Sequence, residues 1–252
     1  MINFRILAFV FLFLLISACS QETSIYAVAE TEPVTTSGDA ADDPALIINF
    51  KNSRKSLILG TDKTAGVYLY NLAGKKLAFA AIGEINNIDA RQQNDAIYIA
   101  ASNRSSQSIE FWVLDQNTFF KKHTRSDQIF SSAIRSYTIP SNIDVYGICI
   151  GMIEGTPVAF VTEDRGPRVE MWTLEKQKLV GTFDNGGESE GCVFDDENKT
   201  LFISEEETNG VLKAYDLNKE YPFAEPAIVD SREGNIGGDP EGVAIYKTSK
   251  TE

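Results

Sequence analysis

The sequence of 252 residues contains a single histidine, His123, in a segment rich in lysine and arginine. It also lacks a Cys-x5-Arg motif and a glycine-rich loop of the kind that cradles phosphate groups. We expect His123 to be exposed rather than catalytic. These shortages disfavour histidine-based phosphatase chemistry, and they remove the motifs on which cysteine-based phosphatases and P-loop enzymes depend.

Positive charge is also scarce. The chain has 23 lysine and arginine residues against 36 aspartate and glutamate residues, which gives a formal net charge of −13. Non-specific binding to nucleic acid requires a basic face, so we expect no nucleic-acid partner. The acidic balance suits a protein that binds cations, although a solvated acidic surface explains it equally well.

The N-terminus carries an apolar run, Ile6 to Ile16, of only 11 residues. A membrane-spanning helix needs about 20, whereas this is the length of the apolar core of a signal peptide. The following residues, Leu15 to Cys19, are similar to a bacterial lipobox; an ordinary secretory signal is the alternative. We therefore expect a lipoprotein signal peptide at 1–18 and a lipidated Cys19 with a flexible tether at 19–41. The protein would be exported from a bacterial cell and lipid-anchored at the outer membrane, in the periplasm or at the cell surface.

Only two cysteines remain beyond Cys19, namely Cys149 and Cys192. An exported protein is free to form disulfides, so a bridge between them is possible. However, Cys149 lies three residues after Tyr146, whereas Cys192 lies two residues after Glu190. Side chains alternate between the two faces of a strand, so we expect these two to point in opposite directions and to remain buried thiols.

A short phrase recurs along the chain. Tyr146, Glu190 and Glu241 are each followed by glycine and then by a short apolar stretch, at spacings of 190 − 146 = 44 and 241 − 190 = 51. Asn87 and Asp43 occupy the same place in the two earlier units. A repeat of roughly 40–50 residues made of short strands is typical of a β-propeller. The recurring residues would converge on the central channel, where Glu, Asp and Tyr oxygens suit a hard cation.

Each unit after Asp42 follows one pattern of four short strands separated by polar turns, with no amphipathic helix of useful length. We therefore predict an all-β domain over 42–252. It would contain about four propeller blades and, at Glu241 to Tyr246, the first strand of a fifth. In the second unit we expect the fourth strand from Phe119 onward. Four blades and one strand do not close a ring, which suggests a truncated sequence or a broken copy of a longer protein.

The motifs that carry these units resemble those of the β-propeller phytases, which are calcium-dependent enzymes. Eight segments occur in the same order: Asp42-Asp43-Pro44-Ala45, Leu59-Gly60-Thr61-Asp62-Lys63, Asn86-Asn87-Ile88-Asp89-Ala90-Arg91, Ala100-Ala101-Ser102-Asn103-Arg104-Ser105, Val145-Tyr146-Gly147, Ser189-Glu190-Gly191, Ile203-Ser204-Glu205-Glu206 and Asp239-Pro240-Glu241-Gly242.

The resemblance implies a six-bladed propeller with several calcium ions in the channel mouth. The implied metal ligands are Asp43, Pro44, Tyr146, Glu190, Glu206, Asp239 and Glu241, and the implied catalytic residues are Tyr146, Glu190, Glu206 and Glu241. The residues implied to bind substrate phosphates are Lys63, Arg91 and Arg104. Glu188, Glu205 and Glu207 are expected to be solvated turn residues.

The implied reaction is hydrolysis of phosphomonoesters of myo-inositol hexakisphosphate (phytate), bound as a calcium complex, by a water that the metal activates. The complete protein would be a monomer. Two alternatives remain open. One is a catalytically incomplete propeller that binds calcium or a partner, and the other is a calcium-dependent lactonase or esterase. Thr64 and the acidic segment 163–165 depart from the basic residues usual in the family.

Overall fold

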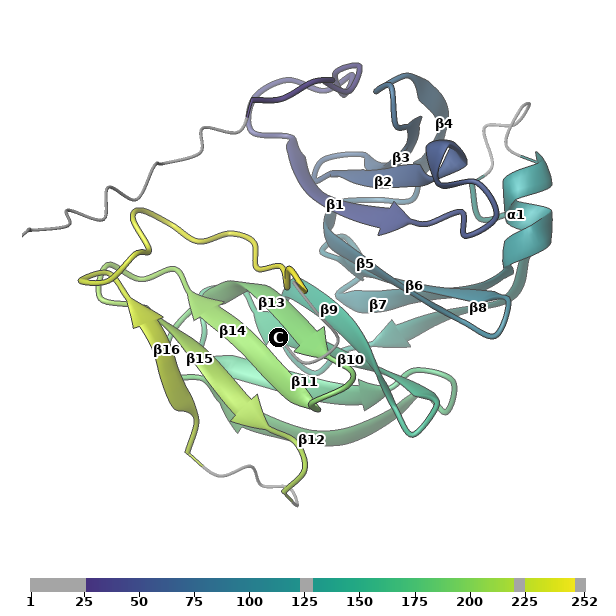
Figure 1. Ribbon diagram of the computed structural model, residues 1–252. Helices are drawn as coiled ribbons and strands as arrows, with labels where there is room; N and C mark the ends of the chain where they lie inside the picture. Colours follow the sequence, from purple (N-terminus) through teal and green to yellow (C-terminus); the bar gives the residue numbers. More distant parts are fainter. Residues whose placement is uncertain (1–25, 123–128, 220–224, 248–252) are drawn as a thin grey trace, which may run out of the picture.

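The computed structural model describes residues 26–122, 129–219 and 225–247. These residues form four antiparallel sheets of four strands each, and the sheets follow one another in an arc (Figure 1). The predicted all-β propeller is confirmed, with four blades in the described part of the chain. No helix in this part is long and apolar enough to cross a bilayer. The signal peptide and Cys19 lie outside the described residues, as does His123.

Each blade is a simple meander whose first strand is innermost. Blade one comprises β1 (Ala41–Ile47), β2 (Leu57–Asp62), β3 (Gly66–Asn71) and β4 (Lys76–Ala81), with a short 3-10 turn at Ser53–Lys55. Blade two comprises β5 (Ile85–Gln93), β6 (Ala96–Asn103), β7 (Ser108–Asp115) and β8 (Ala133–Pro140). Blade three comprises β9 (Val145–Ile153), β10 (Thr156–Glu163), β11 (Arg168–Thr173) and β12 (Lys178–Asp184). Blade four comprises β13 (Ser189–Asp195), β14 (Thr200–Glu205), β15 (Val211–Asp216) and β16 (Ala227–Ser231).

The core lies between neighbouring blades, which explains why the inner strands are apolar on both faces. Ile148 and Ile150 of β9 belong to the apolar cluster shared with blade two, whereas Cys149 between them belongs to the cluster shared with blade four. The innermost strands contact one another in succession, β1 with β5, β5 with β9 and β9 with β13. This packing places the starts of the four strands around one axis.

Blade two differs from the expected pattern, because residues after Asp115 form a helix rather than a strand. Helix α1 spans Gln116–Lys122, and β8 follows at Ala133–Pro140. The Asp115 carboxylate accepts a hydrogen bond from the Thr118 backbone N–H at 2.7 Å, as an N-cap residue does. Phe119, predicted to open a strand, is fully buried in the same apolar cluster as Trp112.

The predicted fifth-blade strand is also absent, since Glu241 to Tyr246 has no strand structure. A strand requires a hydrogen-bonding neighbour, and this segment instead touches blade four through side chains. The Ser204 hydroxyl donates to the Pro240 carbonyl oxygen at 2.9 Å, and Lys247 pairs with Glu197 at 3.0 Å. The segment therefore crosses the end of blade four as an extended loop (Figure 1).

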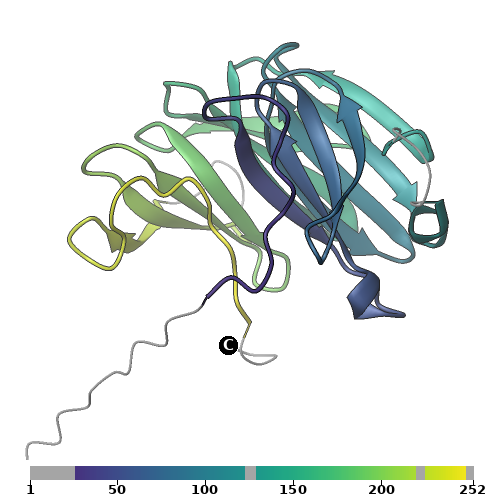
Figure 2. The same ribbon diagram turned by 90° about the horizontal axis from the view of Figure 1, so that it is seen from above.

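Residues before β1 run along the outer face of blade one (Figure 2). The Glu32 backbone N–H donates to the Gly74 carbonyl oxygen at 2.8 Å, and the Thr36 hydroxyl donates to Asp62 at 2.7 Å. Thr35 also contacts the Tyr68 hydroxyl. The predicted tether at 19–41 is thus bound to blade one over its final part.

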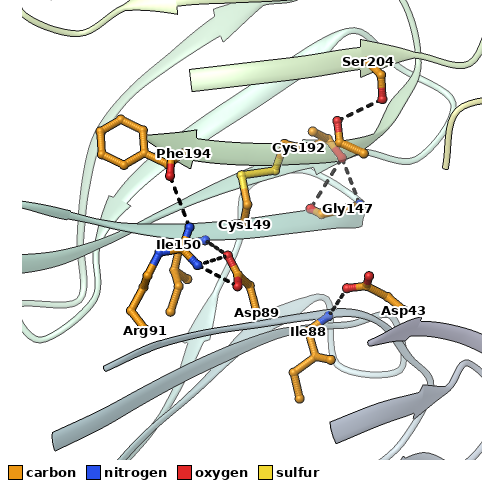
Figure 3. The surroundings of a disulfide bond; sticks show 12 residues. Asp43, Ile88, Asp89, Arg91, Gly147, Cys149, Ile150, Cys192, Phe194 and Ser204 are labelled. Atoms are coloured by element: carbon orange, nitrogen blue, oxygen red, sulfur yellow. Dashed lines mark hydrogen bonds and ion pairs between the residues drawn. A yellow bond between two sulfur atoms is a disulfide. The ribbon is translucent and has the colours of Figure 1, made fainter. Parts of the chain in front are cut away.

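Cys149 and Cys192 form a disulfide, with their Cα atoms 5.7 Å apart (Figure 3). The expectation of two separate thiols was wrong because it compared the two strands as if they shared one sheet. They belong to neighbouring blades that face each other. Side chains that point to opposite faces of their own sheets therefore meet in the interface between blades three and four.

Candidate active site

Every innermost strand contains a β-bulge near its start. In β13, Ser189 pairs with Glu205 and Cys192 pairs with Ile203, so three steps on β13 oppose two on β14. The same irregularity occurs in β1, β5 and β9. A bulge redirects side chains and is frequent beside active sites. The bulge pairs are Asp42-Asp43, Asn86-Asn87, Tyr146-Gly147 and Glu190-Gly191.

The bulges correct the predicted alignment of the repeat by one residue in the first two blades. The residues equivalent to Tyr146 and Glu190 are Asn86 and Asp42, rather than Asn87 and Asp43. The shift was invisible in the sequence because the first two bulges lack the glycine that marks the later ones. Asp42 and Asn86 are therefore the site residues that the sequence interpretation missed.

Glu190 is buried at the centre of the site and is held by Asn86. The Asn86 side-chain amide donates to Glu190 Oε1 at 2.5 Å, and both side chains are buried. The Asn86 oxygen accepts a hydrogen bond from Arg104 Nη1 at 3.2 Å. Glu190, a predicted metal ligand, and Arg104, a predicted phosphate-binding residue, thus both bond to Asn86.

Tyr146 and Glu206 form the second pair of the site. The Tyr146 hydroxyl donates to Glu206 Oε2 at 3.2 Å. The Arg104 guanidinium carbon lies 5.9 Å from the centre of the Tyr146 ring, within the range of a cation–π contact. Arg104 also lies 3.6 Å from the carboxylate of Asp164.

Lys63 lies on the blade-one side of the site between two carboxylates. Its amino group is 2.9 Å from Asp39 and 3.2 Å from Asp42. Asp39 is almost fully exposed, whereas the Asp42 side chain is buried. The charge of Asp42 in turn raises the pKa of Glu190, which connects Lys63 to the central carboxylate.

Asp43 and Pro44 line a different part of the channel. Asp43 Oδ2 accepts a hydrogen bond from the Ile88 backbone N–H at 2.9 Å, which joins blade one to blade two (Figure 3). Pro44 lines the same open hollow between the inner strands as Asp43 and Ile88. Burial, with the charges of Asp89 and Asp42, raises the pKa of Asp43 to about 7.

Arg91 lies apart from Lys63 and Arg104, the other predicted phosphate-binding residues. Its guanidinium pairs with Asp89 at 2.9 Å and donates to the Phe194 carbonyl oxygen at 3.3 Å (Figure 3). It also pairs with Asp196 at 3.5 Å. Asp89 also accepts the Ile150 backbone N–H at 3.0 Å. These contacts connect blades two, three and four further along the channel, and the role of Arg91 in phosphate binding stays a prediction.

Asp239 and Glu241 lie on the extended segment that follows blade four, and both are exposed. Their charges contribute to the raised pKa of Glu206, which places them on its side of the site. Glu205, expected to be a solvated turn residue, is instead buried and forms an ion pair with Lys213 at 2.5 Å.

The central carboxyl groups resist ionisation. Burial raises the pKa of Glu190 to about 8, with a further contribution from the charge of Asp42. Burial raises the pKa of Glu206 to about 7, assisted by the charges of Glu188, Glu241 and Asp239. Burial also raises the pKa of Asp42, and burial together with the two glutamates raises that of Tyr146. A cation bound near these clustered acids would stabilise their ionised forms and lower their pKa values.

Two further observations test whether the site fits calcium. Asp42 Oδ2 and Glu206 Oε1 are buried and have no hydrogen-bond partner among the described residues. Buried carboxylate oxygens without partners are unfavourable unless a cation completes them, and calcium prefers oxygen ligands. Within the described ranges no three His, Cys, Asp or Glu side chains converge as a preformed metal site. The residues fit calcium by the chemistry of their oxygen atoms.

Fold and site thus define a propeller that gathers acidic and phenolic oxygens beside basic side chains at one end of its channel. The family model named Phytase matches residues 7–252, and the chain belongs to this family. A 3-phytase of Bacillus subtilis (strain 168) is 31% identical over 240 residues. That match covers 88% of this chain and 60% of the relative, so the chain spans about 60% of the length of that protein.

Proposed function

We propose that the protein is a calcium-dependent phytase that hydrolyses phosphomonoesters of phytate. The observation that carries the proposal is the meeting of Asp42, Tyr146, Glu190 and Glu206 beside Lys63 and Arg104. Membership of the Phytase family and the similarity to a 3-phytase support it. A lactonase or esterase acts on neutral esters and does not need two basic residues such as Lys63 and Arg104 to bind phosphate.

The acidic residues would hold calcium. Asp42, Glu190 and Glu206 supply carboxylate oxygens, Tyr146 supplies a phenolic oxygen, and Asp239 and Glu241 approach from the segment after blade four. Asp43 and the Pro44 carbonyl would form a separate structural site between blades one and two. Bound calcium supplies positive charge that neutralises phosphoryl oxygens and acidifies water.

The basic residues would hold the substrate. Arg104 presents a planar guanidinium that can donate two hydrogen bonds to one phosphate group, and Lys63 presents a compact ammonium group. Both now pair with carboxylates, Arg104 with Asp164 and Lys63 with Asp39 and Asp42. A phosphate group would take the place of the exposed partners, Asp39 above all. The net charge of −13 is no obstacle, because local cations determine the potential inside the pocket.

We also propose that the protein is exported and anchored through lipid on Cys19, on the strength of the apolar run and lipobox-like residues at its N-terminus. A disulfide between blades three and four suits a protein outside the cytoplasm. Mass spectrometry of membrane fractions would detect the acylated N-terminal peptide, and an unmodified Cys19 would overturn the anchor.

The test of function is phosphate release from phytate by the purified full chain, with calcium and with a chelator. We expect release that requires calcium and that Glu190→Gln abolishes. Glu175→Gln is the matched control, since Glu175 follows β11 in blade three and pairs with Arg135 of β8, the outermost strand of blade two. A folded chain that binds calcium and releases no phosphate would support the alternative of a catalytically incomplete calcium-binding propeller.

A further inference from the structure

We infer that Asn86 is a positioning residue that joins the calcium-binding carboxylate Glu190 to the phosphate-binding Arg104. This inference rests on the proposed function. It starts from the bulge alignment, in which Asn86 is the blade-two equivalent of Asp42, Tyr146 and Glu190. The other three carry acidic oxygens suited to a cation. Blade two alone contributes a neutral amide at this level.

The Asn86 side chain uses both of its donors and its acceptor. Its NH2 group donates to Glu190 Oε1 at 2.5 Å and to Asn87 Oδ1 at 2.8 Å. Its oxygen accepts from Arg104 Nη1 at 3.2 Å. Rotating the amide would place its oxygen against two acceptors and its NH2 group against a guanidinium. The three partners therefore allow only one orientation.

No other common side chain of this size serves both neighbours. A carboxylate would accept from Arg104 but repel Glu190, and an alkyl group would remove the hydrogen bonds to both. Asn86 is fully buried, so water cannot easily replace it. Leaving the buried Glu190 carboxyl group without this hydrogen bond is costly, so the amide holds Glu190 and Arg104 at a fixed separation.

The arrangement predicts that calcium and phosphate binding depend on each other through Asn86. If Glu190 turned toward a bound calcium ion, the acceptor of the Asn86 amide would move with it, and the amide oxygen would reorient Arg104. Asn86 itself need touch neither ligand. Loss of the Asn86 side chain should therefore lower the affinity for calcium through Glu190 and the affinity for phosphate through Arg104.

Two double-mutant cycles measured by calorimetry test this, one with calcium alone and one with inorganic phosphate at saturating calcium. We expect Asn86→Ala to lower the affinity for each ligand by about tenfold, which is the effect of losing one hydrogen bond to a charged group. In a Glu190→Gln background it should no longer change calcium affinity. In an Arg104→Ala background it should no longer change phosphate affinity. If Asn86→Ala does not fold, Asn86→Ser replaces it in both cycles.

Asn185→Ala is the matched control, because Asn185 is also buried and bonds Tyr215 and Ser189 in blade four. It should lower the melting temperature without changing either affinity. Additive effects in the cycles, or unchanged affinities, would overturn the role of Asn86. Coupling in the cycles without phosphate release from phytate would overturn the proposed function and leave the inference standing. A chain that binds no calcium would overturn both.

Discussion

Cys149 and Cys192 link the innermost strands of blades three and four across the interface that the two blades share. Cys149 is almost fully buried, and Cys192 lines the channel hollow beside Phe194. The bridge closes a sequence separation of 43 residues and lies within two or three residues of Tyr146 and Glu190. It therefore fixes the relative position of two site residues from different blades.

We expect removal of this bridge to destabilise the protein. A crosslink across a loop of this length typically stabilises a fold by about 2–4 kcal/mol. Cys149→Ser combined with Cys192→Ser should lower the free energy of unfolding by that order, measured by denaturant titration. Reductant should lower the stability of the unsubstituted protein and leave the double variant unchanged. Equal stability with and without reductant would show that the bridge does not form.

The close approach of blades three and four makes Gly147 irreplaceable. A Cβ at Gly147 would clash with the Glu190 carbonyl oxygen, which belongs to the backbone and cannot move alone. Gly147→Ala should therefore cost at least about 1–3 kcal/mol, the usual effect of overpacking. Gly237→Ala is the control, since a Cβ there meets nothing within 4 Å. Comparable melting temperatures for the two variants would contradict the packing of the bulges.

Much of the fold could be predicted from the sequence because each blade repeats a local pattern. Short apolar stretches separated by polar turns are enough to locate most strands. Helix α1 was missed because Phe119 and Phe120 read equally well as strand residues, and the cap at Asp115 is recognisable only with the Thr118 contact. The disulfide was missed because strand alternation describes one sheet, whereas the bridge joins two.

Candidates for the site were predictable where a residue type carries its own chemistry, as with Glu190, Glu206, Tyr146, Lys63 and Arg104, and their roles stay predictions. Asn86 and Asp42 were not, because their role follows from a bulge that shifts the repeat by one residue. Arg91 shows the opposite difficulty. Its contacts with two carboxylates and a carbonyl oxygen could not be read from the sequence, and measurements on a variant are needed to distinguish a structural role from phosphate binding.

Arg91 and Arg104 should therefore respond differently to substitution. Arg91→Ala removes contacts to Asp89, Asp196 and Phe194, so it should lower the free energy of unfolding by about 1–3 kcal/mol and leave the KM for phytate unchanged. Arg104→Ala should raise KM with a smaller effect on stability. Steady-state kinetics and chemical denaturation of both variants separate these outcomes. An Arg91→Ala variant of normal stability and raised KM would return Arg91 to the substrate site.

The raised pKa values of the central acids predict how the metal-free protein responds to pH. Glu190 and Glu206 have folded-state pKa values of about 8 and about 7, above the ordinary value of 4.5. The folded state thus binds more protons than the unfolded state in this window. The stability contribution is fully present below the ordinary value and is lost as pH rises through 7 and 8. Residues such as Glu163, whose pKa is lowered by Arg168, stay ionised throughout and do not mask the effect.

We expect the melting temperature in chelator to fall between pH 6 and pH 9, with a loss on the order of a few kcal/mol. Saturating calcium should remove this fall, because the cation stabilises the ionised carboxylates and binds only the folded state. Glu190→Gln should flatten the profile in chelator, since the amide does not titrate, whereas Glu175→Gln should leave it unchanged. A melting temperature in chelator that rises over this range would contradict this prediction. It would show that other groups of the protein stabilise the ionised carboxylates without metal.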